Sequence, residues 1–122
     1  GSEDIFKAVV SKVVDETREY AYALYLNTSN RLIRLVNIGI GGIDTTLVDI
    51  RFLIAEALKL NATAVALVHN HPSGSLMPSR QDDELTNNLS KACSLMKIRF
   101  VDHVIISSNG KDYYSYHDKG RV

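Results

Sequence analysis

The sequence has a single cysteine, no tryptophan and no excess of charge of either sign. Its 122 residues hold 14 Lys and Arg against 14 Asp and Glu, which gives a formal net charge of zero. One cysteine, Cys93, excludes an intrachain disulfide framework and a metal site built from several thiolates. A neutral chain has no overall attraction to nucleic acid or to an anionic membrane, although a local patch would still be allowed. We therefore expect no direct nucleic-acid binding from this domain.

The chain also lacks a long apolar span, a signal peptide, internal repeats and low-complexity segments. A cytoplasmic location away from membranes fits these absences. Hydrophobic residues make up 45% of the sequence, which is enough for one domain with its own core over residues 1–122. Gly1 and Ser2 stand in place of an initiator methionine and resemble a cloning remnant. We therefore expect a domain excised from a longer protein.

Hydrophobic periodicity predicts an α/β domain with a mixed sheet of about six strands and about three helices. The clearest predicted strands are residues 20–26, 31–38, 64–68, 99–107 and 113–116. The predicted helices are residues 3–15, a helix capped within Asp44 to Thr46 that buries Leu47, Ile50, Ile54, Ala57 and Leu58, and residues 79–96. The order strand, helix, strand across residues 31–68 predicts a parallel pairing of those two strands. Residues 117–122 read as a polar tail.

The strand of residues 64–68 is apolar on both faces, which marks a central strand, and it leads into His69-Asn70-His71-Pro72. Side chains two apart on a strand point the same way, so His69 and His71 share a face and Asn70 lies on the other. Pro72 cannot donate a ladder hydrogen bond and ends the strand. The two histidines therefore lie at the carboxyl end of a central strand, where open α/β sheets commonly place ligands.

A helix start follows, in which Ser79 and Asp82 resemble a capping box with Asp in place of the usual Glu or Gln. Asp82 in the first turn would lie near enough to fold back toward the histidines. Two imidazoles and one carboxylate are a usual three-ligand set for catalytic zinc, with the fourth position left for a water whose pKa falls to roughly 7. The plainer interpretation is that Ser79 only caps the helix, Asp82 only favours the helix dipole, and the histidines are ordinary polar residues.

The spacing of these residues resembles the metal motif of the JAMM, or MPN-type, metalloproteases: His69-x-His71-Pro72, six residues, Ser79, two residues, Asp82. The segments HNHPSG, PSRQDDELT and FVDHVII and the final Tyr-x-Ser-Tyr-x-x-Lys-Gly resemble the RadC family of bacterial proteins. This resemblance runs from about Glu19 to the C-terminus. It implies the MPN fold, which is similar to the cytidine-deaminase architecture. Deaminase chemistry itself is disfavoured, because zinc deaminases use H-x-E with P-C-x-x-C and the chain has neither.

The resemblance also implies roles for individual residues. One zinc ion per chain would be bound by His69, His71 and Asp82. Ser79 would help bind the oxyanion of the tetrahedral intermediate. Glu19 would act as general base through the zinc-bound water, and Glu16, three residues away, remains the alternative for that role. The resemblance gives His103 no ligand role, and we expect it to be structural. Independently of the resemblance, helical spacing places Cys93 on the apolar face of residues 79–96, so we expect a small core residue there.

The expected activity is zinc-dependent hydrolysis of a peptide or isopeptide bond in a peptide or protein substrate. The alternative is a catalytically silent protein- or peptide-binding module of a DNA repair or replication protein, a link that the family name suggests. An exposed edge strand would pair either with a peptide substrate or with a second copy of the chain, so a homodimer also remains open.

Overall fold

The protein is built around one mixed sheet, seen in a computed structural model that describes residues 1–13, 18–41 and 48–122. Within these ranges the chain forms three helices and five strands. They follow in the order α1 (Ser2–Val13), β1 (Glu19–Leu26), β2 (Leu32–Gly41), α2 (Ile50–Lys59), β3 (Ala64–His71), α3 (Arg80–Leu95), β4 (Arg99–Ser107) and β5 (Tyr113–Ser115). The predicted α/β class is confirmed, and the sheet has five strands rather than about six.

The strands lie side by side in the order β2-β1-β3-β4-β5. β3 and β4 pair in parallel across the α3 crossover, and the other neighbouring pairs are antiparallel. The predicted parallel pairing of the strands on either side of α2 is wrong, because β1 lies between β2 and β3. β1 is buried along most of its length, whereas β2 exposes Leu32 (50%) and Ile33 (38%), so β1 takes the inner position and β2 the edge.

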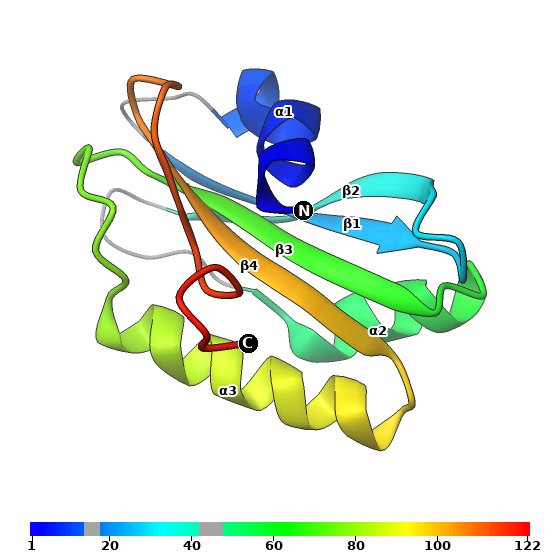
Figure 1. Ribbon diagram of the computed structural model, residues 1–122. Helices are drawn as coiled ribbons and strands as arrows, with labels where there is room; N and C mark the ends of the chain where they lie inside the picture. The colour runs from blue at the N-terminus through cyan, green and yellow to red at the C-terminus, as the bar shows by residue number, and fades with distance from the viewer. Residues whose placement is uncertain (14–17, 42–47) are drawn as a thin grey trace.

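Helices cover both faces of the sheet, with α1 on one side and α2 and α3 on the other (Figure 1). The α1 face packs Ile5, Val9 and Val13 against Leu24, Ala66, Val68, Val104 and Ile106. The opposite face packs Leu53, Ala57, Leu89 and Cys93 against Ala21, Val65 and Leu67. β3 supplies alternate residues to both clusters and is buried throughout, which confirms it as the central strand. Cys93 is confirmed as a core residue.

The helix ends differ from their predicted positions by a few residues. α1 ends at Val13, and α2 begins at Ile50 with Asp49 as its N-cap, whose carboxylate accepts hydrogen bonds from the backbone N–H groups of residues 51 and 52. The predicted caps, Asp44 to Thr46, lie outside the described residues, as does Leu47. Leu58 is 50% exposed, because α2 turns Leu53 and Ala57 toward the sheet instead. In the part of the chain that the structure describes, no helix combines the length and apolar character that a membrane crossing requires.

The C-terminal segment packs against helix α3 and is not simply a polar tail. β5 ends at Ser115, and the next residue, Tyr116, is buried. The Tyr116 hydroxyl donates to Asp83 Oδ1 at 2.7 Å, and Arg121 donates to the same oxygen at 2.7 Å while lying over the Tyr116 ring. The segment therefore closes over the first turn of α3, where Asp82 lies.

Candidate metal centre

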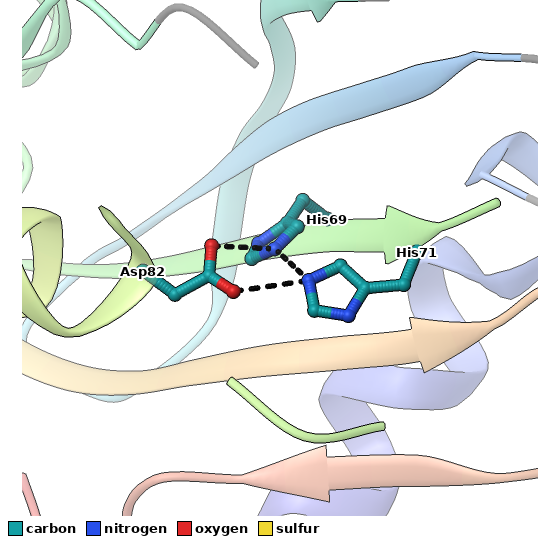
Figure 2. A group of neighbouring side chains, drawn as sticks. All are labelled: His69, His71 and Asp82. Atoms are coloured by element: carbon teal, nitrogen blue, oxygen red, sulfur yellow. Dashed lines mark hydrogen bonds and ion pairs between the residues drawn. The ribbon is translucent and has the colours of Figure 1, made fainter. Parts of the chain in front are cut away.

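The two histidines and the aspartate of the sequence motif meet where β3 ends and α3 begins (Figure 2). After His71 the chain turns sharply, with the Gly74 N–H donating to the His71 carbonyl at 2.9 Å. Gly74 has a φ of +85°, a left-handed conformation that glycine adopts without strain. The loop then returns to the same end of the sheet and starts α3 at its N-cap, Ser79. A local turn and a local helix start are thus enough to bring Asp82 back to the histidines.

The predicted capping box holds the Asp82 carboxylate in place. The Ser79 hydroxyl accepts a hydrogen bond from the Asp82 N–H at 3.0 Å, and Asp82 Oδ2 accepts one from the Ser79 N–H at 2.8 Å. The same carboxylate faces both histidines. Asp82 therefore serves the helix N-terminus and the histidine cluster at once.

The donor atoms of the three residues form a small group, the ligand triangle, in which each histidine Nε2 faces a different carboxylate oxygen of Asp82. His69 Nε2 lies 3.1 Å from His71 Nε2 and 3.1 Å from Asp82 Oδ1, and His71 Nε2 lies 3.0 Å from Asp82 Oδ2. All three residues are buried, with exposed fractions of 3%, 8% and 9%. A tetrahedral ion with bonds of about 2.0–2.1 Å spaces its ligand atoms about 3.3 Å apart. The group therefore could hold a metal ion after adjustments of a few tenths of an ångström.

The ring of His71 is oriented by a backbone carbonyl. Its Nδ1 lies 2.9 Å from the Ser75 carbonyl oxygen. A carbonyl can only accept, so Nδ1 carries the hydrogen and donates it. In the neutral ring the lone pair then resides on Nε2, which faces His69 and Asp82. This is the tautomer that a metal ligand needs.

His69 is backed by another histidine, His103, on the neighbouring strand β4. His69 Nδ1 lies 2.8 Å from His103 Nε2, and His103 Nδ1 lies 2.6 Å from the Thr86 hydroxyl. The His103 ring stacks on Tyr116 with centroids 4.8 Å apart. Burial lowers the pKa of His103 well below its usual value, and the charge of a protonated His69 would lower it further. His103 is thus a fully buried, neutral neighbour of the site.

Sequence reasoning assigned His103 to a structural role and missed its contact with His69. The signal was present in the strand register. The parallel pairing of β3 with β4 sets His103 beside Leu67, on the same face as His69. The sequence-based prediction instead placed the strand of residues 31–38 parallel to β3, which does not reveal that His103 and His69 share a face.

The electrostatics of the cluster favour a charged aspartate. Burial raises the pKa of Asp82, but the hydrogen bonds that His69 and His71 donate from Nε2 when protonated outweigh it and hold this pKa well below its usual range. Burial lowers the pKa of His71, but the hydrogen bond and charge of Asp82, the Ser75 carbonyl and the charge of Glu19 together raise it above 6.5. An anionic carboxylate beside two imidazoles suits a divalent cation.

Glu19, the expected general base, lies at the start of β1 on the histidine face of the sheet. The pairing of Ala21 with His69 carries Glu19 alongside His71, and its charge contributes to the raised pKa of His71. Glu19 is 9% exposed. Glu16, the alternative, lies outside the described residues. Ser79 is exposed at the helix start, and because its oxygen accepts the capping bond, its own proton can be donated elsewhere.

Asn70 is a second residue whose role sequence reasoning did not find. It is fully buried, its Oδ1 accepts the Tyr20 N–H at 2.7 Å, and its Nδ2 donates to the Arg18 carbonyl at 2.9 Å. The Asn70 amide therefore forms hydrogen bonds with the backbone on both sides of Glu19. The sequence indicated only that Asn70 faces away from the histidines, because the pairing of β1 with β3 was not foreseen.

Comparison with known proteins agrees with the motif. The family model described as the RadC-like JAB domain matches residues 1–121. The chain is 37% identical over 118 residues to a UPF0758 protein of Chlorobaculum tepidum, a match that covers 97% of the chain and 52% of the relative. It is 37% identical over 122 residues to a UPF0758 protein of Streptococcus suis, covering 100% of the chain and 49% of the relative.

A UPF0758 protein of Chlorobium phaeovibrioides is 35% identical over 122 residues, which are 100% of the chain and 54% of the relative. The chain thus spans about half the length of the curated relatives it matches. The resemblance read from the motifs is confirmed, and the chain belongs to the RadC-like JAB domain family.

Proposed function

We propose that this domain is a zinc-dependent, metallopeptidase-like hydrolase that cleaves a peptide or isopeptide bond. The observation that supports it most is the buried ligand triangle of His69, His71 and Asp82. Its two Nε2 atoms lie 3.1 Å apart, and each lies 3.0–3.1 Å from one carboxylate oxygen. Two imidazoles and one carboxylate are a donor set typical of catalytic zinc. A bound zinc ion would polarise a water molecule and lower its pKa toward 7, which supplies a nucleophile at neutral pH.

The residues around the triangle supply the rest of the chemistry in this proposal. Glu19, beside His71, takes the proton from the attacking water and delivers it to the leaving amine. Ser79 donates a hydrogen bond from its hydroxyl to the oxyanion that forms on the carbonyl oxygen, and keeps its proton. The capping box supports this role, because it holds the Ser79 oxygen as an acceptor and leaves the proton to point outward.

The proposed substrate is a peptide or protein and not a nucleic acid. The formal net charge of zero offers no overall attraction to a phosphate backbone. A link to DNA repair, as the family name suggests, would then act through a protein substrate or partner. The activity and partners of the longer relatives are part of this proposal, since the chain spans about half their length.

Metal content of the purified domain is the first test. We expect one zinc per chain by elemental mass spectrometry, lost in His71→Ala and kept in His117→Ala, a matched control at an exposed histidine. Full retention of zinc by His71→Ala would remove the ligand assignment. Absence of zinc from the unmodified protein, even after zinc is added, would refute the proposal.

Cleavage of a peptide library by the zinc-loaded domain is the second test. We expect Glu19→Gln to keep zinc and to lose about 10²- to 10⁴-fold in turnover, the range for a general base. If Glu16→Gln is the inactive variant instead, the base is Glu16. Stable binding of peptides by the zinc-loaded domain without any cleavage would favour the protein-binding module over the hydrolase.

A further inference from the structure

We propose that His103 is a positioning residue for the metal centre, which together with Thr86 fixes the tautomer of His69 so that its Nε2 lone pair faces the ion. The inference rests on the proposed metal site, and it concerns residues outside the ligand triangle. It follows from the direction of three successive hydrogen bonds, which begin at a backbone carbonyl of helix α3.

The first bond sets the direction of the others. The Thr86 hydroxyl donates to the Asp82 carbonyl oxygen at 2.8 Å. A carbonyl oxygen only accepts, and a hydroxyl has one proton, so Thr86 can only accept in its 2.6 Å contact with His103 Nδ1. The hydrogen of the His103 ring therefore resides on Nδ1.

The tautomer of His103 then determines that of His69. His103 is fully buried, so its ring is neutral and carries a single N–H. With that hydrogen on Nδ1, His103 Nε2 is an acceptor, and its 2.8 Å contact requires a hydrogen on His69 Nδ1. The lone pair of a neutral His69 is thus on Nε2, which lies 3.1 Å from both His71 Nε2 and Asp82 Oδ1.

The opposite tautomers would close the metal site and break a bond within α3. A hydrogen on His69 Nε2 would donate to Asp82 Oδ1 and occupy the place of an ion, and His103 would have to donate from Nε2. His103 Nδ1 would then need a proton from Thr86, which would break the bond from Thr86 to the Asp82 carbonyl. That carbonyl belongs to the first turn of α3, and loss of a buried hydrogen bond there would destabilise the opposite tautomers.

Neighbouring residues fix the plane of the His103 ring, and this keeps its two nitrogens directed at Thr86 and His69. We call this chain of hydrogen bonds the tautomer relay. The His103 ring is nearly parallel to the Tyr116 ring, with an interplanar angle of 5°. Tyr116 is anchored in turn to Asp83, the neighbour of the ligand Asp82. The His103 backbone N–H donates to Asp102 at 2.7 Å, which fixes the strand at this residue. The C-terminal segment and α3 therefore locate the ring from two sides.

The two candidate ligands reach the same tautomer by different routes. His71 is oriented directly by the Ser75 carbonyl, whereas His69 is oriented through His103 and Thr86. We therefore expect the two histidines to have the same nitrogen protonated in the metal-free protein, and only His69 to depend on His103.

The tautomers can be measured without metal or substrate. Long-range ¹⁵N–¹H correlation spectra of the histidine rings in the metal-free protein at neutral pH should show His69 protonated at Nδ1 and His103 protonated at Nδ1. A His69 ring protonated mainly at Nε2 would overturn the inference. This measurement uses the unmodified chain, so it decides the question even if every variant fails to fold.

Substitutions at His103 separate positioning from packing. His103→Phe keeps a planar ring against Tyr116 but removes the acceptor, and we expect zinc affinity to fall about 10- to 100-fold, as for other partners of metal-bound histidines. His103→Gln can place its carbonyl oxygen near the former Nε2 and should recover most of the loss. His117→Gln, at an exposed histidine, is the matched control and should bind zinc as the unmodified protein does.

Thr86→Val gives an independent second test, because it removes only the hydroxyl that holds His103 in its tautomer. We expect its spectra to show mixed tautomers for His69, with weaker zinc binding in competition with a chelator. Zinc affinity within about twofold of the unmodified protein in both His103→Phe and Thr86→Val would refute the positioning role. If the unmodified protein binds no zinc, the proposed function fails, while the ring spectra still decide the tautomer relay.

Discussion

The two faces of strand β3 both become polar at its carboxyl end, but in different ways. On the face covered by α2 and α3, the apolar residues Val65 and Leu67 are followed by His69 and His71. On the α1 face, Ala66 and Val68 are followed by Asn70. The histidines direct ring nitrogens toward other side chains, whereas Asn70 uses both ends of its amide to hold the backbone of β1.

The two faces of β3 position functional side chains in two ways, through contacts between side chains on one face and through backbone hydrogen bonds on the other. The candidate ligands are fixed through contacts between side chains, so their geometry depends on the identity of neighbouring residues. Glu19 is positioned through its own backbone, so its location depends on Asn70. We therefore expect changes on the histidine face to alter metal binding, and changes at Asn70 to alter turnover at constant metal content.

The largest effect is expected from Asp82→Asn. An asparagine can still accept the Ser79 N–H and keep the helix cap, but it brings no charge to the histidines. We expect a folded protein whose zinc affinity, measured by chelator competition, falls by more than the roughly 100-fold typical of losing an outer partner. Asp83→Asn, at a residue that contacts Tyr116 and Arg121 instead, is the control. Equal zinc binding in the two variants would contradict the division between the faces.

The next effect is a dependence of zinc affinity on pH. A ligand histidine must be neutral, and protons compete with the ion. Because the pKa of His71 is raised above 6.5, its protonation begins at a higher pH than for an ordinary histidine, and the loss of affinity should begin there as pH falls. Below that pKa we expect about a tenfold loss per pH unit, measured by competition titration. Asn70→Ala should leave this profile unchanged, since an amide does not titrate.

Asn70→Ala should have a moderate effect that does not involve the metal. It removes the partners that the side chain gives to the Tyr20 N–H and the Arg18 carbonyl, which should lower the free energy of unfolding by about 1–3 kcal/mol. We expect unchanged zinc content and reduced turnover, since Glu19 is less firmly placed. Urea unfolding and elemental analysis test both points.

Asn37→Ala is the matched control for Asn70→Ala. Asn37 also accepts a backbone N–H, that of Gly39 at 3.1 Å, but it lies exposed on the edge strand β2. The free energy of unfolding of Asn37→Ala should differ from that of the unmodified protein by no more than about 0.5 kcal/mol. Loss of zinc from Asn70→Ala would show that the two faces of β3 do not act separately.

The smallest effect concerns the apolar part of the histidine face. Burial raises the pKa of the Cys93 thiol to about 11, so at pH 8 only about one thiol in a thousand is ionised. We expect no reaction of Cys93 with a thiol reagent in the native protein and rapid reaction after unfolding in urea. Fast labelling of the folded protein would mean that the core beneath the histidines opens readily.

The candidate site was predictable where its parts are close in sequence. His69 and His71 share a face because strands alternate, and Asp82 follows in a helix whose start is signalled by Ser79. These are local rules of strand, turn and cap, and the structure reproduces them. The three predicted helices and the core position of Cys93 were likewise visible in the hydrophobic periodicity.

The parts that sequence reasoning missed all depend on which strands become neighbours. Periodicity identifies a strand but does not say what lies beside it. β1 returns between β2 and β3, and this brings the Asn70 amide to the backbone around Glu19. β4 pairs with β3, and this brings His103 to His69. Tyr116 was assigned to a strand, but its ring packs on His103, a contact between segments that no local pattern encodes.

The same division between near and distant contacts has a consequence for the order of folding. His71 and Asp82 are 11 residues apart, whereas His69 and His103 are 34 residues apart. Closing the shorter loop, between His71 and Asp82, loses less conformational entropy than closing the longer one. During synthesis this shorter loop is also complete before β4 has been made. We therefore expect a nascent chain to capture an ion loosely in the turn after β3, and to bind it tightly only once β4 docks. A bound ion would then stabilise the end of β3 early in folding, before β3 pairs in parallel with β4, a long-range pairing of a kind that forms slowly.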